Sequence, residues 1–177
     1  MLRAECQNNG MSLIELMITL MIAAVLASLA LPGFRNFLDN VKVTSAASQF
    51  RSAISLARTE AMRRGVRVDL IPSKGRDWSH GWMVVLDANN NHQADTGEVI
   101  LHYGAKMPDQ LFIIAGLRDT KPYLSFDPSG RPRSIASSAV PQIGSFLFSV
   151  GSMKRKIIIG FLGRVRSCDP DKDQATC

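Results

Sequence analysis

The sequence predicts an α+β protein in which one long N-terminal helix packs on a head of antiparallel β-sheet. Two observations support this prediction. Apolar residues first form one long, nearly uncharged stretch and then recur at helical spacing as far as residue 64. From residue 66 onward they fall into short runs separated by turn-forming residues. A helix and a sheet that are each apolar on one side must cover one another, which gives the α+β arrangement.

The overall composition is that of a globular protein. Of the 177 residues, 20% are charged and 46% are hydrophobic, which argues against a disordered or fibrous chain. The 21 Lys and Arg residues outnumber the 15 Asp and Glu residues and give a formal net charge of +6. This excess favours an anionic partner, such as nucleic acid, lipid headgroups or an acidic protein, without choosing between them.

Residues 11–31 predict a membrane-inserted helix. Their sequence, MSLIELMITLMIAAVLASLAL, carries a single charge at Glu15. As a helix it would be roughly 31 Å long, the thickness of the hydrocarbon core of a bilayer. A buried core helix is the alternative, but no other segment is apolar enough to surround it. A carboxylate is costly in lipid, and near the start of a helix the helix dipole offsets part of that cost.

The helix is expected to continue through Pro32 as an amphipathic segment, residues 32–65. Apolar residues at helical spacing form its buried stripe: Ala47, Phe50, Ile54, Ala57 and Ala61. Arg63 and Arg64 near the negative end of the helix dipole, followed by Gly65, predict its end. The expected helix therefore runs from about Ser12 to Arg64. Two helices separated at Pro32 are the alternative and would change the architecture little.

Residues 66–177 predict the β-rich head. Seven short segments have strand character and are bounded by turn-forming residues: 66–71, 82–86, 98–103, 111–114, 123–126, 145–150 and 156–161. Residues 127–144 are rich in Pro, Ser and Gly and predict a mobile loop. We find no second helix and no internal repeat in the sequence.

The N-terminal residues resemble the prepilin signal of type IV pilins and pseudopilins. In that family a short polar leader ends in Gly, and an apolar helix with Glu at its fifth position follows. Here residues 1–10 end in Gly10, Met11 stands where Phe is usual, and Glu15 is fifth. The resemblance implies that a prepilin peptidase cuts after Gly10 and methylates the amine of Met11. It also implies that Glu15 pairs with the amine of a neighbouring subunit during assembly.

The segments ARTEAMRRG (57–65) and GWMVVLDANNNHQADTGEVIL (81–101) resemble the FimT/GspH class of minor pilins and pseudopilins. This resemblance implies a single-pass inner-membrane protein with its head in the periplasm, later assembled with other pilin or pseudopilin subunits. Two functions are implied. One is a minor pilin near the tip of a type IV pilus; the other is an H-type pseudopilin of a type II secretion system with no DNA role.

The expected hairpin loop also carries oxygen ligands. Five of them fall on ligand positions of an EF-hand-like calcium loop: Asp87, Asn89, Asn91, Asp95 and Glu98. His92 stands where such loops need Gly for a sharp turn, and the loop joins two strands, not two helices. The alternative is a polar turn whose side chains bond to their own backbone. The sequence does not decide between these readings, and we assign no metal ligand.

We do not expect an enzyme or a cofactor. The three histidines, His80, His92 and His102, lie in or beside the expected hairpin. No serine or cysteine motif accompanies them to form a nucleophile pair. Surface histidines in a polar loop are the simpler interpretation.

The cysteines predict one disulfide once the prepilin resemblance is accepted. Cys6 lies in the leader and would leave with it, so that Cys168 and Cys177 remain as a pair. A head in the periplasm would allow them to oxidise. The loop between them, CDPDKDQATC, is polar and would form a surface cap. Two free thiols are the alternative.

Cations concentrate just before that loop: Lys154, Arg155, Lys156, Arg164 and Arg166, with no acidic residue between Gly151 and Arg166. In extended chain, Arg164 and Arg166 point to one side, roughly 6–7 Å apart, close to the phosphate repeat of a nucleic-acid strand. The run GRVR (163–166) also resembles the Gly-Arg-x-Arg motif of FimT proteins implicated in DNA uptake. We therefore expect DNA contact here, with outlying contributions from Arg118, Arg131 and Arg133. A solvated strand face is the alternative.

The prepilin interpretation predicts the mature N-terminus. Protein from a strain with the peptidase should begin at Met11 and carry a methyl group on its amine, as intact mass would show. Replacing Gly10 with a bulky residue should leave the full-length form in the membrane, whereas Glu15→Ala should be processed but assemble poorly. A mature N-terminus within residues 12–31 would contradict the interpretation.

Overall fold

The computed structural model describes residues 12–89, 91–117, 122–134, 140–175 and 177. The chain divides into two compact units, Met1–Leu38 and Asp39–Cys177. This boundary lies within the expected amphipathic segment and not at its start. The only helix in the described residues is α1, Leu13–Arg64, and it matches the expected span. Ser12 caps it, because both its backbone and side-chain oxygens accept from the N–H of Glu15, at 3.1 and 3.3 Å.

In the first unit, the apolar side chains of α1 lack a covering layer. Leu13, Met21 and Leu29 are all exposed, the last to 74%. Among the described residues no single helix meets the length and hydropathy required to cross a membrane, but Leu13–Leu29 and Gly33–Arg64 meet it together as a bent pair. Such a surface requires lipid or neighbouring protein to keep it from water.

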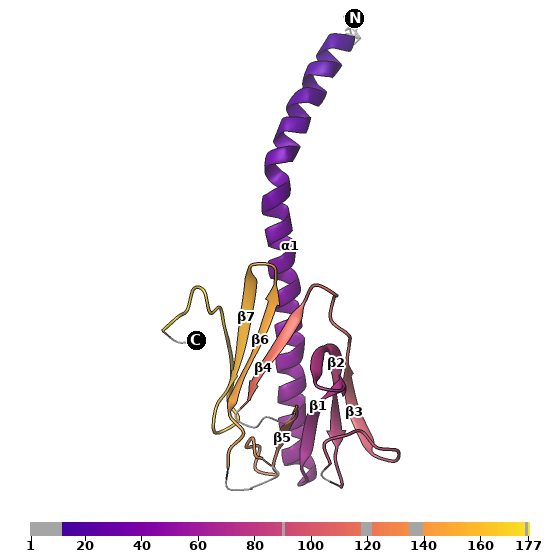
Figure 1. The fold of residues 1–177 in the computed structure, drawn as a ribbon, viewed down its shortest axis with the longest axis vertical. Coiled ribbons are helices and arrows are strands. Elements are labelled where there is room, and N and C mark those ends of the chain that lie inside the picture. Colours follow the sequence, from indigo (N-terminus) through magenta and orange to yellow (C-terminus); the bar gives the residue numbers. More distant parts are fainter. Residues whose placement is uncertain (1–11, 90, 118–121, 135–139, 176) are drawn as a thin grey trace, which may run out of the picture. The chain divides into compact units, whose positions relative to one another are not determined.

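The second unit contains eight strands in its described residues: β1 (Val68–Lys74), β2 (Asp77–Leu86), β3 (Val99–Gly104), β4 (Phe112–Leu117), β5 (Leu124–Phe126), β6 (Gly144–Val150), β7 (Met153–Ile159) and β8 (Val165–Cys168). They form two antiparallel sheets with the orders β3-β2-β1-β5 and β4-β6-β7-β8 (Figure 1). The α+β prediction is therefore confirmed, and each of the seven expected strands has a counterpart.

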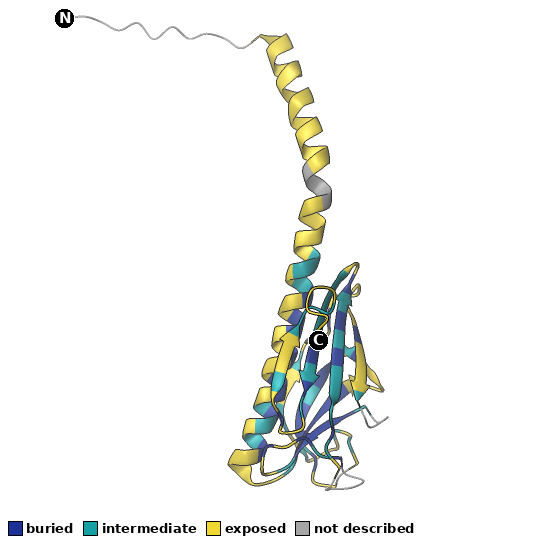
Figure 2. Cartoon of the chain, turned by 90° about the vertical axis from the view of Figure 1, so that its left-hand side faces the viewer, coloured by how far each residue is buried: buried dark blue, intermediate teal, exposed yellow. Residues whose placement is uncertain are grey.

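Both sheets pack on the same stripe of α1. All five residues of the expected stripe are buried. Phe50 contacts both sheets, since its ring lies 4.9 Å from that of Trp82 on β2 and 4.6 Å from that of Phe146 on β6, centroid to centroid. The outer side of this part of the helix is exposed, whereas β1, β5 and much of β2 are buried and the other strands mix buried, intermediate and exposed residues (Figure 2). The core of the head therefore forms around Phe50.

Two sequence expectations differ from the structure. The segment Val165–Cys168 is not among the seven expected strands and was considered only as extended chain, but hydrogen bonding to β7 makes it an edge strand. Residues 127–144 were expected to be a mobile loop, yet both described ends are held. Gln142 is buried, accepts from the N–H of Ser125 at 2.9 Å and donates to the carbonyl of Tyr123 at 2.8 Å. Its side-chain amide thus occupies the place of a strand partner for β5.

Phe50→Ala should destabilise the head by about 3–5 kcal/mol, because it leaves a cavity between α1 and both sheets. Urea unfolding of the full chain in detergent, followed by tryptophan fluorescence, would measure this. Phe112→Ala is the control, since Phe112 is 62% exposed on β4, and it should cost no more than about 0.5 kcal/mol. Equal losses in the two variants would contradict the central place given to Phe50.

Candidate nucleic-acid interface

Of the residues expected to act in processing and assembly, Gly10 and Met11 lie outside the described residues. Glu15 lies in the first turn of α1 and is exposed. The negative charge is therefore placed where the helix dipole favours it. Cleavage after Gly10 and pairing of Glu15 with an amine remain predictions.

Two of the three cations of β7, Lys154 and Lys156, share a face of the sheet with Arg166, whereas Arg155 lies on the side that faces α1. Ile157 and Ile159 are buried, so their neighbours Lys156 and Ile158 point outward. In the register of the two strands, Ile158 lies opposite Arg166 and Lys156 lies opposite Cys168. Side chains that lie directly opposite one another point to the same face. The outer face therefore carries basic residues from both strands.

Three of the expected DNA contacts have partners within the chain. Lys154 Nζ lies 3.2 Å from Asp171 Oδ1, and Lys156 Nζ donates to the carbonyl oxygen of Cys177 at 3.0 Å. Arg155 donates to Asp169 Oδ2 at 2.7 Å and to Asn40 Oδ1 at 2.9 Å. These three side chains hold the C-terminal segment, and Arg155 also ties it to α1. The charges of Lys154 and Arg155 are in part already compensated by these carboxylates.

Arg164 and Arg166 differ from these three residues. Both are exposed, and neither guanidinium has a hydrogen bond or ion pair to another residue in the described part of the chain. Arg164 directly precedes β8, and Arg166 lies within it. The two free cations of the basic segment are thus those of the GRVR run.

Gly163 and Arg58 fix the turn before Arg164. Gly163 has a φ of +76°, and a Cβ added there would lie 2.5 Å from the carbonyl oxygen of Gly130. No other residue fits this position without a shift of the backbone. Arg58 on α1 donates from Nη1 to the carbonyl oxygen of Gly163 at 2.9 Å. The helix therefore positions the turn that presents Arg164.

The outlying arginines contribute less. Arg118 lies outside the described residues. Arg133 is largely buried, and its Nε lies 3.4 Å from Asp127 Oδ2. Arg131 is exposed, and its backbone N–H donates to Asp127 Oδ1. Of these three, only Arg131 presents an exposed side chain in the described chain.

The expected disulfide joins Cys168 to Cys177, with their Cα atoms 5.8 Å apart. It closes the C-terminal segment onto the end of β8. The chain-entropy relation gives such a loop of about ten residues a stabilisation of about 2.7 kcal/mol. The disulfide and the β7 cations therefore hold the same segment.

The hairpin loop bonds to itself, as the polar-turn alternative describes. Asp87 accepts from the N–H groups of Asn91 and His92, and Glu98 accepts from those of Ala88 and Asp95. The side-chain amides of Asn89 and Asn91 both donate to Asp95 Oδ2 at 2.6 Å. His92 takes a φ of 67° where a Gly was considered necessary. Each of the five residues considered for calcium thus accepts at least one hydrogen bond within the loop through a side-chain oxygen.

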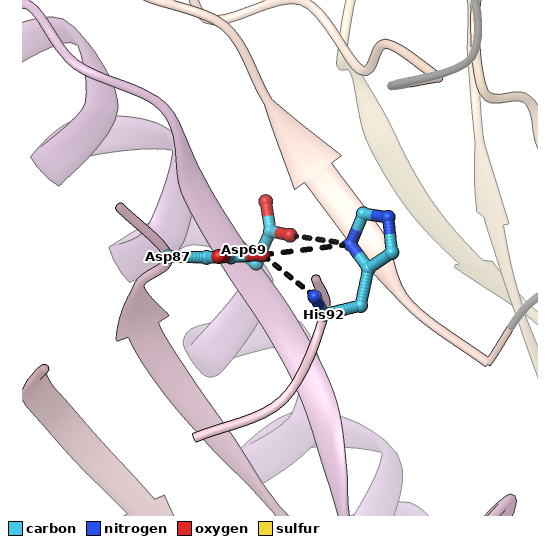
Figure 3. Close-up of side chains that lie close together, drawn as sticks. All are labelled: Asp69, Asp87 and His92. Atoms are coloured by element: carbon cyan, nitrogen blue, oxygen red, sulfur yellow. Dashed lines mark hydrogen bonds and ion pairs between the residues drawn. The ribbon is translucent and has the colours of Figure 1, made fainter. Parts of the chain in front are cut away.

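His92 also joins a buried polar cluster that sequence reasoning missed (Figure 3). Its Nδ1 lies 2.9 Å from Asp69 Oδ2 and 3.7 Å from Asp87 Oδ2. Ser125 donates to the other oxygen of Asp69, and the ring of His92 stacks on Tyr123 at 3.6 Å. The ligand atoms of the three residues lie within 4.8 Å of one another, close enough to hold a metal ion. An aspartate amid the apolar residues of VRVDLI was the one available signal.

The other two histidines are separate from this cluster. His80 Nδ1 lies 2.7 Å from Asp77 Oδ2 at an exposed position, and His102 lies on β3 opposite Val84. Each of the three histidines thus occupies a different environment.

Both the N-terminal segment and the head match known protein families. A model described as "Prokaryotic N-terminal methylation motif" matches residues 6–31, and one described as "Type II transport protein GspH" matches residues 46–163. The N-terminal motif and the helix packed on antiparallel sheets define a minor type IV pilin or pseudopilin. The chain belongs to the GspH family, and the FimT/GspH resemblance is confirmed.

Individual relatives agree with this assignment. The pilin-like protein PilA1 of Thermus thermophilus is 28% identical over 167 residues, covering 89% of this chain and 97% of the relative. The type IV minor pilin FimU of Pseudomonas aeruginosa has a TM-score of 0.57 at 18% identity, covering 77% of this chain and 95% of FimU. The minor pseudopilin EpsH of the Vibrio cholerae type 2 secretion system has a TM-score of 0.53 at 12% identity, covering 74% and 99%. The two solved structures show the fold.

Family membership has consequences for partners and location. Pilins and pseudopilins assemble with other subunits, and a peptidase processes their prepilin motif. The chain is accordingly a membrane-anchored subunit of a pilus or pseudopilus.

Asp69→Asn should flatten the dependence of stability on pH. Burial raises the pKa of Asp69 above its ordinary value. The hydrogen bonds with His92 and Ser125 lower this pKa, but burial has the larger effect. The folded state therefore binds more protons than the unfolded state above about pH 4, so the contribution of Asp69 to stability falls as pH rises. In thermal unfolding from about pH 4 to about pH 7, the melting temperature of Asp69→Asn should rise relative to that of the parent as the pH increases.

Asp109→Asn is the control for this comparison. A hydrogen bond from Lys106 lowers the pKa of Asp109, which is exposed. The melting temperature of Asp109→Asn should not rise relative to that of the parent as the pH increases. A parallel pH dependence for the parent and Asp69→Asn would contradict the raised pKa.

Proposed function

We propose that this chain is a minor type IV pilin at or near the pilus tip that helps assembly and binds DNA for uptake in natural transformation. The contact is made to the phosphate backbone, so that binding has little sequence preference. Arg164 and Arg166 make the principal contacts, and Lys154 and Lys156 assist from the face of the sheet that carries Arg166.

One observation supports this proposal above the others. Many described cations are paired with carboxylates, as Arg63 is with Glu60 and Lys106 with Asp109. Arg164 and Arg166 are exposed without such a partner. A free guanidinium binds phosphate without first giving up an internal ion pair. The pairing of Lys154 with Asp171 gives that lysine the weaker contribution.

The second candidate is an H-type pseudopilin of a type II secretion system. The description of the matching family and the fold shared with EpsH favour it. In that case the head is a structural subunit for protein secretion and has no nucleic-acid role. Deletion would then impair secretion, and the protein would not bind DNA at low salt.

The double variant Arg164→Ala/Arg166→Ala tests the DNA contact. If about four phosphates are contacted, the log–log slope of affinity against salt for duplex DNA should be near −3.6, at about −0.9 per phosphate. Loss of two contacts should make that slope shallower by about 1.8. Transformation should fall while filaments still form. Fluorescence anisotropy on the full chain in detergent, at several salt concentrations, gives the slope.

A double variant that removes the same charge elsewhere is the control: Arg63→Ala/Lys106→Ala. Both side chains are exposed, at 60% and 61%, and each is paired with an acid. Its slope should remain close to that of the parent. If the two double variants lose affinity equally, the assigned contact is wrong and only net charge matters.

A further inference from the structure

A groove separates α1 from the turn before β8 in the second unit. The side chains of its helix wall include Arg51, Ser52, Ser55, Arg58 and Thr59, and Arg164 lies on the opposite wall. The sequence gives no sign that these two segments are neighbours, because more than 100 residues separate Arg58 from Gly163. The turn is held at the helix by the bond from Arg58 to the carbonyl of Gly163.

The residues that line the groove include three arginines and no acid. Arg51 is exposed, and its guanidinium has no hydrogen bond or ion pair within the described residues. The Nε of Arg58 is buried and has no hydrogen-bond partner there either. Further along the same helix, Glu60 binds both Arg63 and Arg64. The helix thus neutralises its last two arginines and leaves those of the groove without a carboxylate.

We propose that this groove receives the phosphate backbone of DNA and that Arg51 of α1 is a further phosphate contact. The inference rests on the proposed function and extends it from the C-terminal segment to the helix. Arg164 belongs to the groove and directly precedes β8, which carries Arg166. Linked phosphates bound beside Arg51 and Arg164 in the groove would continue along β8 towards Arg166.

The chemistry of the lining favours a nucleic acid. Arginines and the hydroxyls of serine and threonine are the groups that contact phosphate and sugar in protein–DNA complexes. Guanidinium groups held close together without an acid repel one another, and a polyanion relieves that repulsion. Arg58 acts as a positioning residue, because its bond to Gly163 sets where Arg164 stands.

Arg51→Ala tests the inference by fluorescence anisotropy with a labelled duplex and the full chain in detergent. Loss of one phosphate contact should make the salt slope shallower by about 0.9 and weaken binding about eightfold at 0.1 M salt. Arg51→Lys should keep the slope, because it keeps the charge. Ser52→Glu, which places a carboxylate at an exposed position of the lining, should weaken binding at least as much as Arg51→Ala.

Arg63→Ala is the matched control, since it removes an exposed arginine from the same helix. It should leave the affinity within about twofold, because its charge is already paired. If Arg51→Ala and Ser52→Glu match this control while Arg164→Ala/Arg166→Ala loses binding, the inference is wrong and the proposed function stands. If the parent does not bind DNA at all, the proposed function fails and the inference with it.

Inorganic phosphate separates a DNA groove from a site for a small anion. About 10 mM phosphate at constant ionic strength should leave DNA binding unchanged, because counterion release depends on several linked phosphates. Displacement of the duplex by phosphate at that concentration would assign the groove to the free ion and overturn the inference.

Discussion

The contact of Phe50 with both sheets is the interaction on which the rest of the head depends. Trp82 belongs to one sheet and Phe146 to the other, and the ring of Phe50 lies against both. Trp78 and Phe146 also meet directly, with their ring centroids 5.1 Å apart. Two four-stranded sheets therefore share one aromatic core on α1. Because both sheets pack on one stripe of α1, residues distant in sequence can meet at the surface of the helix.

The C-terminal segment depends on this arrangement. Arg155 joins Asp169 to Asn40 at the helix, and the disulfide closes the chain from Cys168 to Cys177. These bonds use some of the cations in the basic segment. The arginines that remain free lie where β8 forms an edge of its sheet, and an edge strand is open to a partner on one side. The cations of β7 therefore hold the C-terminal segment, while the neighbouring arginines at β8 remain free at the edge of the sheet.

Local patterns made much of the fold predictable. The spacing of Phe50, Ile54 and Ala57 gave the buried face of α1, and short apolar runs gave seven of the strands. The division into two sheets was not predictable, because strand order depends on pairings between distant segments. Gln142 could not be recognised as a partner of β5, since a polar residue in a Pro- and Ser-rich stretch carries no sign of burial.

The candidate site was predictable only in part. The GRVR run pointed to Arg164 and Arg166, and their exposure fits that interpretation. In the sequence, Lys154 and Arg155 looked equivalent to the arginines of the GRVR run. Their pairing with Asp171 and Asp169 arises only because the C-terminal segment folds back against β7. Arg51 and Arg58 had no local signal, because a cation on the exposed side of an amphipathic helix is ordinary. The buried cluster of Asp69, Asp87 and His92 likewise appears only when the hairpin loop folds back onto β1.

The most direct test of the account follows each arginine separately as DNA is added. Nuclear magnetic resonance of the full chain in detergent, recorded on the Nε–H groups of its arginines, distinguishes the free cations from the paired ones. If the free arginines contact DNA, the signals of Arg51, Arg164 and Arg166 should shift with a short duplex while that of Arg63, paired with Glu60, stays in place. Shifts confined to other arginines, or none at saturating DNA, would contradict it.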